Sequence, residues 1–503
     1  MLDMASTILS QMKPNTIRRD FTFRFCWVFL FLVLHYFVIN WVLRPIIYKI
    51  NENKGGLFME LGSWSIIKST PSLLALLPLL VYLIMVFRNK SNLAGLMVGV
   101  VAGAILTGQG LKSLAGIFAT SLGSFLAIIG IIIMFGSGLG YLMNKTKVTH
   151  TLVYWIVKGV GVNTEKKGII ATILSSIVIC GLLGTLAGGN AIIAPVLIPV
   201  VAAVGLTPSA VTALFKVAGE VGLIMGPLTG VTLTTMKVTG LSYGQLMLWA
   251  VIPFSIVWLG STIFAVGRIQ KKLRGVEVYE ITEDMVDLSK IEISKEEKRT
   301  TILFLLSFAL LVAYGVISKQ GTTYAIIVML ILAVVLIISS RTELDEALNV
   351  FVEGASKMTN MFLVFIFFEV MFVLIGIGGG FDALGVLLTG LVGGGGKAIV
   401  VILASLVGGF GIEAAAVAEI TIVHEMFIDL VNGVGLPMSI WATALLAATR
   451  ITGALYPTAN LAGQLGIARC TNMKEVLKAS WIGAGALFAW VIIWAFIGPM
   501  IAG

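Results

Sequence analysis

Apolar segments of about twenty residues recur along the whole chain, separated by short polar or basic stretches. A helix of about that length crosses a hydrocarbon core of about 30 Å, and no segment shows the alternation of a half-buried strand. The pattern predicts uninterrupted spans at residues 24–43, 72–87, 92–108, 118–143, 241–267, 301–318, 322–340, 350–376 and 476–501. An amphipathic piece at 148–160 and an interfacial stretch around 393–396 are too short to span.

Two further spans are broken by proline and glycine. Pro227 stands between two glycines in the apolar stretch 207–239, and Pro457 interrupts the stretch 437–470. A break leaves backbone groups without helical partners, which hydrocarbon tolerates only where they line a cavity or a ligand. With these two helices the prediction comes to eleven spans, and broken helices at matching places in two halves indicate a transporter's substrate site.

Two long apolar runs, 167–204 and 397–433, are interrupted at their centres and are predicted to be re-entrant hairpins. The basic stretches of the first half, such as RIQKKLR at 268–274, fall on one side of the membrane only if the first run enters and returns on the same side. The tip of that hairpin, CGLLGTLAGGN at 180–190, has four glycines that permit a tight backbone.

The two halves of the chain repeat. A shift of 230 residues superposes 167–250 on 397–480 without a gap, aligning the two breaking prolines and placing Arg450 at the position of Glu220. Each half has five full spans, an odd number, so the second half must be upside down relative to the first. The predicted fold class is an all-α polytopic membrane protein with two inverted repeats, each containing a re-entrant hairpin and a broken helix.

This organisation divides the chain into four parts. They are an extra span with an outer segment at 1–70, a first repeat at 71–270, a cytoplasmic linker at 271–300 and a second repeat at 301–503. The linker is rich in both acidic and basic residues and has no apolar periodicity long enough for a domain. Basic residues ahead of the first span place the N-terminus in the cytoplasm.

Composition excludes a soluble globular protein, because only 12% of the 503 residues are charged and 58% are hydrophobic, whereas about a quarter are charged in soluble domains. The net charge of +9 comes from Lys and Arg that flank spans, so we infer no nucleic-acid binding. Cys26, Cys180 and Cys470 have no metal-ligand spacing, so neither a metal site nor a cofactor is expected. No serine elbow, Walker lysine or zinc-protease motif indicates an enzyme.

Ionisable side chains within spans are costly and usually functional. Lys216 and Glu220 lie one turn apart on the first broken helix and can pair. Arg450 either binds an anionic ligand with its planar fork of donors or serves as the structural partner of Glu220. Glu413 and Glu419 lie at the tip of the second hairpin, where we expect a role in coupling to Na⁺ or H⁺.

The order of two scaffold spans, a long span with an amphipathic tail, a re-entrant hairpin, a broken helix and a closing span resembles the ion-transporter superfamily over roughly residues 70–500. This group includes divalent-anion/sodium symporters, citrate and C4-dicarboxylate carriers, and the large membrane subunits of tripartite periplasmic (TRAP) transporters. Where the symporters carry Ser-Asn-Thr motifs, this chain reads GTLAGGN and GGFGIEAAAVAE at the tips, and GPLTG and YPTAN at the breaks. The resemblance therefore implies the architecture rather than the sodium sites or a dicarboxylate substrate. It also implies a homodimer whose substrate domain moves past a fixed scaffold, the elevator form of alternating access.

We predict the substrate site where the first tip, 184–190, meets the two breaks, 226–230 and 456–460. Half-helices that begin there carry a partial positive charge that favours an anion. The predicted substrate-binding residues are Thr185, Asn190, Gly226, Pro227, Thr229, Gly230, Arg450, Pro457, Thr458 and Asn460. The predicted coupling-ion residues are Glu220, Glu413 and Glu419.

The leading functional interpretation is a secondary active transporter of the bacterial inner membrane that moves a small organic anion with H⁺ or Na⁺. Two alternatives stay open. A cation/proton antiporter would use the intramembrane acids, and the membrane subunit of a multicomponent, TRAP-like uptake system would depend on a binding protein.

Overall fold

The computed structural model of the protein describes residues 60–88, 90–280, 293–392, 396–407, 416–456 and 458–501. Within these ranges the regular secondary structure is entirely helical. The predicted first span, 24–43, lies outside the described residues.

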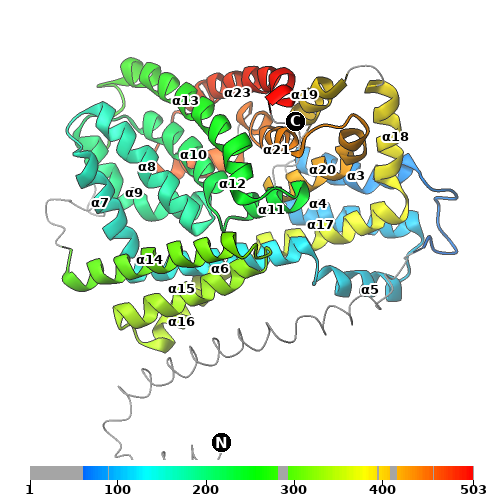
Figure 1. The fold of residues 1–503 in the computed structure, drawn as a ribbon, viewed down its shortest axis with the longest axis horizontal. Helices are drawn as coiled ribbons and strands as arrows, with labels where there is room; N and C mark the ends of the chain where they lie inside the picture. Colours follow the sequence, from blue (N-terminus) through cyan, green and yellow to red (C-terminus); the bar gives the residue numbers. More distant parts are fainter. Residues whose placement is uncertain are drawn as a thin grey trace, which may run out of the picture.

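The helices of the first half follow the apolar segments (Figure 1). They are η1 (Leu73–Leu76), α3 (Leu77–Phe87), α4 (Asn92–Thr107), α5 (Leu111–Ser121), α6 (Phe125–Lys145), α7 (Val148–Val160), α8 (Glu165–Leu183), α9 (Leu186–Ala203), α10 (Pro208–Met225), α11 (Gly230–Thr239), α12 (Tyr243–Leu246), a π-helical turn η2 (Met247–Val251) and α13 (Ile252–Leu273). Helix α10 ends and helix α11 begins where the sequence places the first break.

The second half has the same order of elements. They are α14 (Lys295–Ile317), α15 (Tyr324–Ser340), α16 (Leu344–Ser356), α17 (Thr359–Ile377), α18 (Gly380–Val392), α19 (Gly396–Val407), α20 (Ala416–Gly433), α21 (Met438–Ala448), η4 (Thr452–Ala454), α22 (Ala459–Ile467) and α23 (Met473–Ile501). Eight helices of the described part are long and apolar enough to cross a membrane.

Two predicted spans are each divided in the structure. The segment predicted as one span at 118–143 contains the end of α5 and most of α6, because Ser124 caps a new helix by accepting a hydrogen bond from the amide of Ala127 at 3.2 Å. The segment 350–376 is likewise divided between α16 and α17. The predicted boundaries were wrong at both places, since apolar composition continues across a turn that a single capping residue determines.

Each of several helix contacts has a counterpart between the equivalent helices of the other half of the chain. Helix α3 packs on α4 as α14 packs on α15, and α4 lies against α17 as α15 lies against α6. The short helices follow the same rule, since α7 contacts α14 and α18 contacts η1. The inverted orientation of the halves stays a prediction, as does re-entry of the hairpins, because α8 and α9 are each long enough to span.

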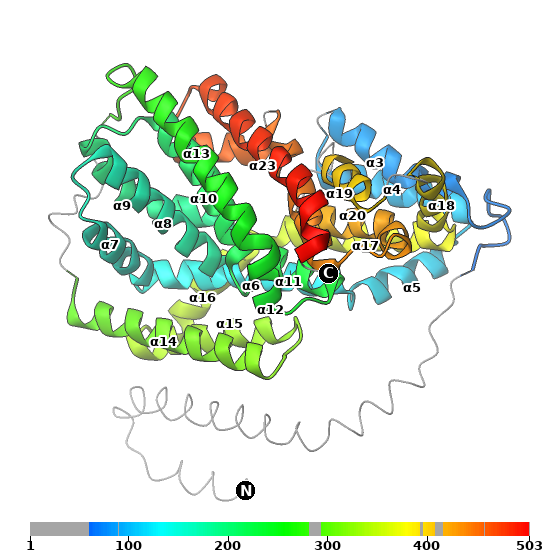
Figure 2. The same cartoon turned by 45° about the horizontal axis from the view of Figure 1, so that its top comes forward.

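Helix α10 lies at the centre of the protein. Of the residues of α10, 89% are buried inside the protein, against 17% in the most apolar part of α14. Helices α13 and α23 run side by side over it (Figure 2). On its other side α8 approaches closely, because a Cβ at Gly222 would lie 2.5 Å from the carbonyl oxygen of Ile177. Glycine at this position therefore lets the first hairpin and the first broken helix pack backbone to backbone.

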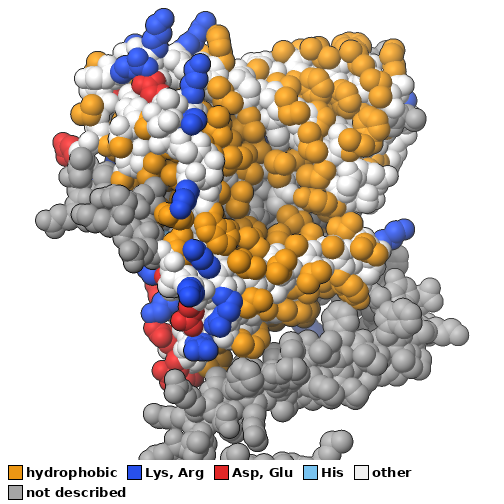
Figure 3. Space-filling model, turned by 60° about the vertical axis from the view of Figure 1, so that its left-hand side comes forward, with side chains coloured by type: hydrophobic (Ala, Val, Ile, Leu, Met, Phe, Trp, Pro, Cys, Tyr) orange, Lys and Arg blue, Asp and Glu red, His pale blue; other side chains and the backbone are white. Residues whose placement is uncertain are grey.

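The surface has two kinds of region. Hydrophobic side chains cover a broad face, and Lys and Arg gather along one edge of it (Figure 3). A broad apolar face is what a lipid bilayer solvates, so the surface agrees with a membrane protein.

Candidate functional site

The break between α10 and α11 satisfies its own carbonyl groups. The last carbonyls of α10 and that of its C-cap Gly226 accept hydrogen bonds from nearby hydroxyls: Ile224 from Thr232 at 2.9 Å, Met225 from Tyr243 at 2.6 Å and Gly226 from Thr229 at 3.0 Å. These carbonyls are therefore occupied within the chain, contrary to the idea that a break leaves its backbone free for a ligand. The amide end of the break, at the start of α11, faces a cavity instead.

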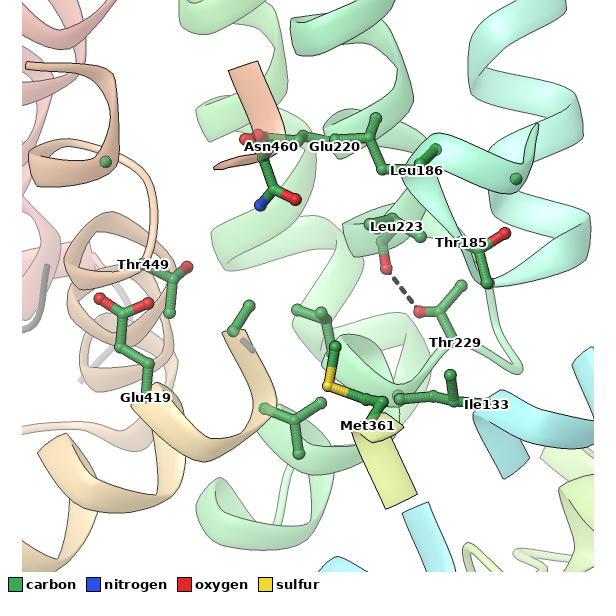
Figure 4. Close-up of a pocket in the computed structure, with 18 of the residues that line it drawn as sticks. Ile133, Thr185, Leu186, Glu220, Leu223, Thr229, Met361, Glu419, Thr449 and Asn460 are labelled. Atoms are coloured by element: carbon green, nitrogen blue, oxygen red, sulfur yellow. Dashed lines mark hydrogen bonds between the residues drawn. The ribbon is translucent and has the colours of Figure 1, made fainter. Parts of the chain in front are cut away.

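This cavity has a volume of about 260 Å³ and lies where the first hairpin tip meets both breaks (Figure 4). Three helices begin at its wall. The first-turn and capping residues that line it are Thr185 to Gly188 of α9, Thr229 to Val231 of α11, and Thr458 and Asn460 of α22, and Ala416 and Val417 of α20 line it too. The first amides of a helix have no intrahelical acceptor and carry a partial positive charge, so three such ends favour an anion in the cavity.

Four ionisable side chains also line the cavity: Lys216, Glu220, Glu419 and Arg450. The guanidinium Nε of Arg450 lies 3.7 Å from Oε2 of Glu220, and the two side chains are only 6% and 8% exposed. The ammonium of Lys216 donates to the hydroxyl of Ser480 at 3.5 Å. The structure therefore confirms that Arg450 and Glu220 are ion-pair partners, one of the two alternatives that the sequence left open for Arg450.

The ion pair leaves donors of Arg450 without a hydrogen bond. Its Nε, 3.7 Å from Glu220, and its Nη2 are both buried, and neither makes a hydrogen bond with the residues that the structure describes. A buried, unsatisfied guanidinium donor is expensive, and an anion in the cavity that Arg450 lines would satisfy it. The structural pairing of Arg450 with Glu220 and a contact between Arg450 and an anion are therefore compatible.

The ion pair also locates the cavity within the repeat. Glu220 and Arg450 occupy equivalent positions under the 230-residue shift. The cavity beside them is lined by residues from both halves of the chain.

A sequence model of the tripartite ATP-independent periplasmic transporter, DctM component, matches residues 70–499. The chain belongs to this family. As a DctM component it is a transport protein rather than an enzyme, and a multi-pass protein of the bacterial inner membrane. Of the three functions that the sequence left open, the family supports the membrane subunit of a TRAP-type secondary transporter.

Two solved structures are similar to this chain. The YdaH transporter of Alcanivorax borkumensis is 15% identical, with 85% of this chain and 99% of that chain covered at a TM-score of 0.56. MtrF of Neisseria gonorrhoeae is 14% identical, with 84% and 95% covered at a TM-score of 0.46. No curated protein sequence matches this DctM component. At such identity the likeness to YdaH supports the helical transporter fold alone.

Most of the residues predicted for the site lie together in this DctM component. Those that line the cavity are Thr185, Glu220, Thr229, Gly230, Glu419, Arg450, Thr458 and Asn460. The hydroxyls of Thr229 and Thr458 cap α11 and α22 by accepting from the amides of Thr232 and Leu461. These two side chains therefore serve the fold as well as the cavity wall.

Three predicted residues have other surroundings, and two cannot be placed. Asn190 is fully buried and forms hydrogen bonds away from the cavity wall. Gly226 packs against α8, where a Cβ would lie 2.4 Å from a backbone oxygen, and Pro227 lies in the turn beside it. Pro457 and Glu413 lie outside the described residues.

The sequence prediction did not include several wall residues of this DctM component. Lys216 is the most consequential of them: its spacing of four residues from Glu220 indicates a pair, but only the structure places it on the cavity wall. Met361 of α17 and Ile133 of α6 come from helices outside the hairpins and breaks (Figure 4). No local pattern in the sequence distinguishes these two from the apolar residues around them.

Proposed function

We propose that this DctM component moves a small organic anion bearing a carboxylate across the inner membrane, coupled to Na⁺ or H⁺. The observation that carries the proposal is the convergence of three helix N-termini and the partly unsatisfied guanidinium of Arg450 on one cavity. The formal charges of the wall cancel, since Lys216 and Arg450 oppose Glu220 and Glu419. The helix ends, each worth about half a positive charge, then leave the cavity attractive to an anion.

The size of the cavity supports a small substrate. Its 260 Å³ lies below the range of about 300–1,000 Å³ that is common for drug-sized ligands. Apolar wall residues such as Met361 and Val417 suit a short carbon skeleton, while the helix ends suit a carboxylate. A guanidinium binds a carboxylate through two parallel hydrogen bonds, which gives orientation as well as affinity.

In this proposal the protein works with a substrate-binding protein and a small membrane subunit, as a component of a tripartite transporter. Glu220 and Glu419 line the cavity. Together with Glu413 they would bind the coupling ion, either Na⁺ or H⁺. Movement of the hairpins and broken helices past the other spans, as in an elevator, would expose the cavity to each side in turn. Assembly as a homodimer belongs to the same proposal.

The test is uptake into proteoliposomes that contain all three components, with acetate, pyruvate, succinate and citrate as labelled probes. We expect at least one carboxylate to accumulate when a Na⁺ or pH gradient is imposed. Arg450→Lys should raise the KM for that carboxylate by about tenfold, because an ammonium lacks the planar fork. Arg268→Lys, on the surface of α13 over the ring of Phe264, is the matched control and should leave KM unchanged.

Two results would contradict the proposal. One is a complete system that exchanges cations across the membrane and accumulates no carboxylate under either gradient. This would favour the cation/proton antiporter, which the acids Glu220 and Glu419 in the cavity also suit. The other is an unchanged KM in Arg450→Lys, which would remove the guanidinium from the anion site.

A further inference from the structure

A fully buried polar cluster joins the first hairpin to the second broken helix. The amide nitrogen of Asn190 on α9 donates to Oε1 of Gln464 on α22 at 2.7 Å and to the carbonyl of Phe215 on α10 at 2.9 Å. Its amide oxygen accepts from the hydroxyl of Ser176 on α8 at 2.7 Å. Asn190 and Gln464 are 274 residues apart and both are 0% exposed. Four helices from both halves of the chain therefore meet at one side-chain amide.

The cluster lies one helical turn behind the cavity wall. Asn190 follows Leu186 by four residues on α9, and Gln464 follows Asn460 by four residues on α22. Leu186 and Asn460 both line the cavity. Residues four apart share a helix face, so the Asn190–Gln464 hydrogen bond ties together two helices whose first turns both line the cavity.

At position 464 an apolar side chain would stabilise the fold more than glutamine does. Its Nε2 atom is buried and makes no hydrogen bond within the described part of the chain. A buried donor without a partner lowers stability, whereas an apolar side chain of similar length would have no such cost. Asn190 retains the carbonyl of Phe215 as an acceptor whether or not Gln464 is an amide. What the glutamine adds is a directional bond between α9 and α22.

The equivalent contact of the other repeat, between α11 and α20, has no such bond. Under the 230-residue shift Asn190 corresponds to Ile420 on α20, and Gln464 corresponds to Thr234 on α11. Helices α11 and α20 pack together as α9 and α22 do. The hydroxyl of Thr234 donates within its own helix, to Gly230 at 2.7 Å, and Ile420 has no polar side-chain atom. The directional tie thus belongs to one of the two equivalent contacts.

We propose that Asn190 and Gln464 are a positioning pair that holds the start of α22 at one separation from the start of α9. The pair keeps Thr458 and Asn460 at a constant distance from Thr185, across the cavity. Neither amide contacts the transported anion. The consequence for uptake rests on the proposed function, whereas the positioning itself does not.

The test measures the distance between the two helices in the full chain, reconstituted in nanodiscs. Spin labels are attached to cysteines placed at the exposed positions Ala191 of α9 and Ala462 of α22. Gln464→Met should broaden the distribution of distances between the labels while changing the melting temperature little. Thr234→Val removes the hydroxyl at the position that corresponds to Gln464 in the other repeat. It is the matched control and should leave the distribution of distances as narrow as in the parent.

Native cysteines do not interfere, because Cys180 and Cys470 are buried and Cys26 can be replaced by serine. If Gln464→Met does not fold, Gln464→Asn serves the same purpose, since the shorter side chain withdraws the amide from Asn190. The exchange variant Asn190→Gln with Gln464→Asn keeps two amides and the combined side-chain length, and should restore a narrow distribution.

In the complete transporter we expect Gln464→Met to raise the KM for a transported carboxylate by about threefold to tenfold, the equivalent of one hydrogen bond, with little change in maximal rate. A distance distribution identical in Gln464→Met and in the parent would overturn the positioning role. Because that measurement needs no ligand, it decides the point even if no carboxylate is transported and the proposed function fails.

Discussion

The ion pair between Glu220 and Arg450 allows stability and anion binding to be separated by mutation. Both side chains are almost fully buried, and Nε of Arg450 lies 3.7 Å from Oε2 of Glu220. We consider three variants: Glu220→Gln, Arg450→Gln and the double variant that carries both. Each single variant leaves one uncompensated charge in the protein interior, and the double variant leaves none.

The structure sets the size of the stability effect. At this separation, with an effective dielectric constant of about 20, the attraction is about 4 kcal/mol, and breaking a buried pair typically costs about 3–5 kcal/mol. Unfolding entropy for a chain of this size converts such a loss into a fall in melting temperature of about 4 °C. We expect a fall of this size in either single variant. The double variant should recover most of it, since a neutral pair costs far less than a lone charge.

Anion binding should respond differently from stability. Arg450→Gln leaves Glu220 and Glu419 opposite Lys216 alone, so the wall becomes net negative and affinity for a carboxylate should fall by about tenfold or more. Glu220→Gln leaves the wall net positive and frees the guanidinium, so affinity should be kept or increased. The two single variants thus resemble each other in stability and diverge in binding.

The assay is thermal unfolding of the purified full chain, with and without the carboxylate that the uptake experiment identifies. The matched control is Glu346→Gln, which breaks the exposed pair between Lys145 of α6 and Glu346 of α16 and should cost at most about 1 kcal/mol. If both cavity variants are as stable as this control, the pair does not support the fold. If Arg450→Gln binds the carboxylate as the parent does, Arg450 does not contact the anion.

Three further predictions concern other parts of the molecule. Gly222→Ala should destabilise the protein by about 1–3 kcal/mol, because the added Cβ would meet a carbonyl oxygen of α8 at 2.5 Å, whereas Gly260→Ala has nothing within 4 Å and should keep the melting temperature. Glu419→Gln should leave expression intact and alter the Na⁺ or pH dependence of uptake, because this carboxylate lines the cavity; an unaltered dependence would place coupling elsewhere. Cysteines at Gly275 and Lys295 should react with an impermeant maleimide only from the cytoplasmic side, and labelling from outside would reverse the predicted orientation.

The membrane helices and their breaks could be predicted from the sequence because their causes are local. Hydrophobicity over about twenty residues is enough to indicate a span, and a proline between glycines is enough to end one inside it. Thr229 and Thr458 begin α11 and α22 because a hydroxyl can cap the amides that follow it. The spacing of 230 residues between the two breaks also placed Glu220 and Arg450 at equivalent positions before any contact was known.

Only the tertiary structure decided how these side chains are used. The amide of Asn190 lies next to a glycine-rich tip in the sequence, which suggested a ligand contact, yet its partners are Gln464 and a carbonyl of α10. Lys216 became a wall residue of the cavity because α10 is surrounded on all sides and its charged face meets the second half of the chain. Such partners lie hundreds of residues apart, so no periodic pattern in the sequence indicates them. A hydrogen bond or an ion pair depends on distance in space, whereas hydrophobic patterning depends on distance along the chain.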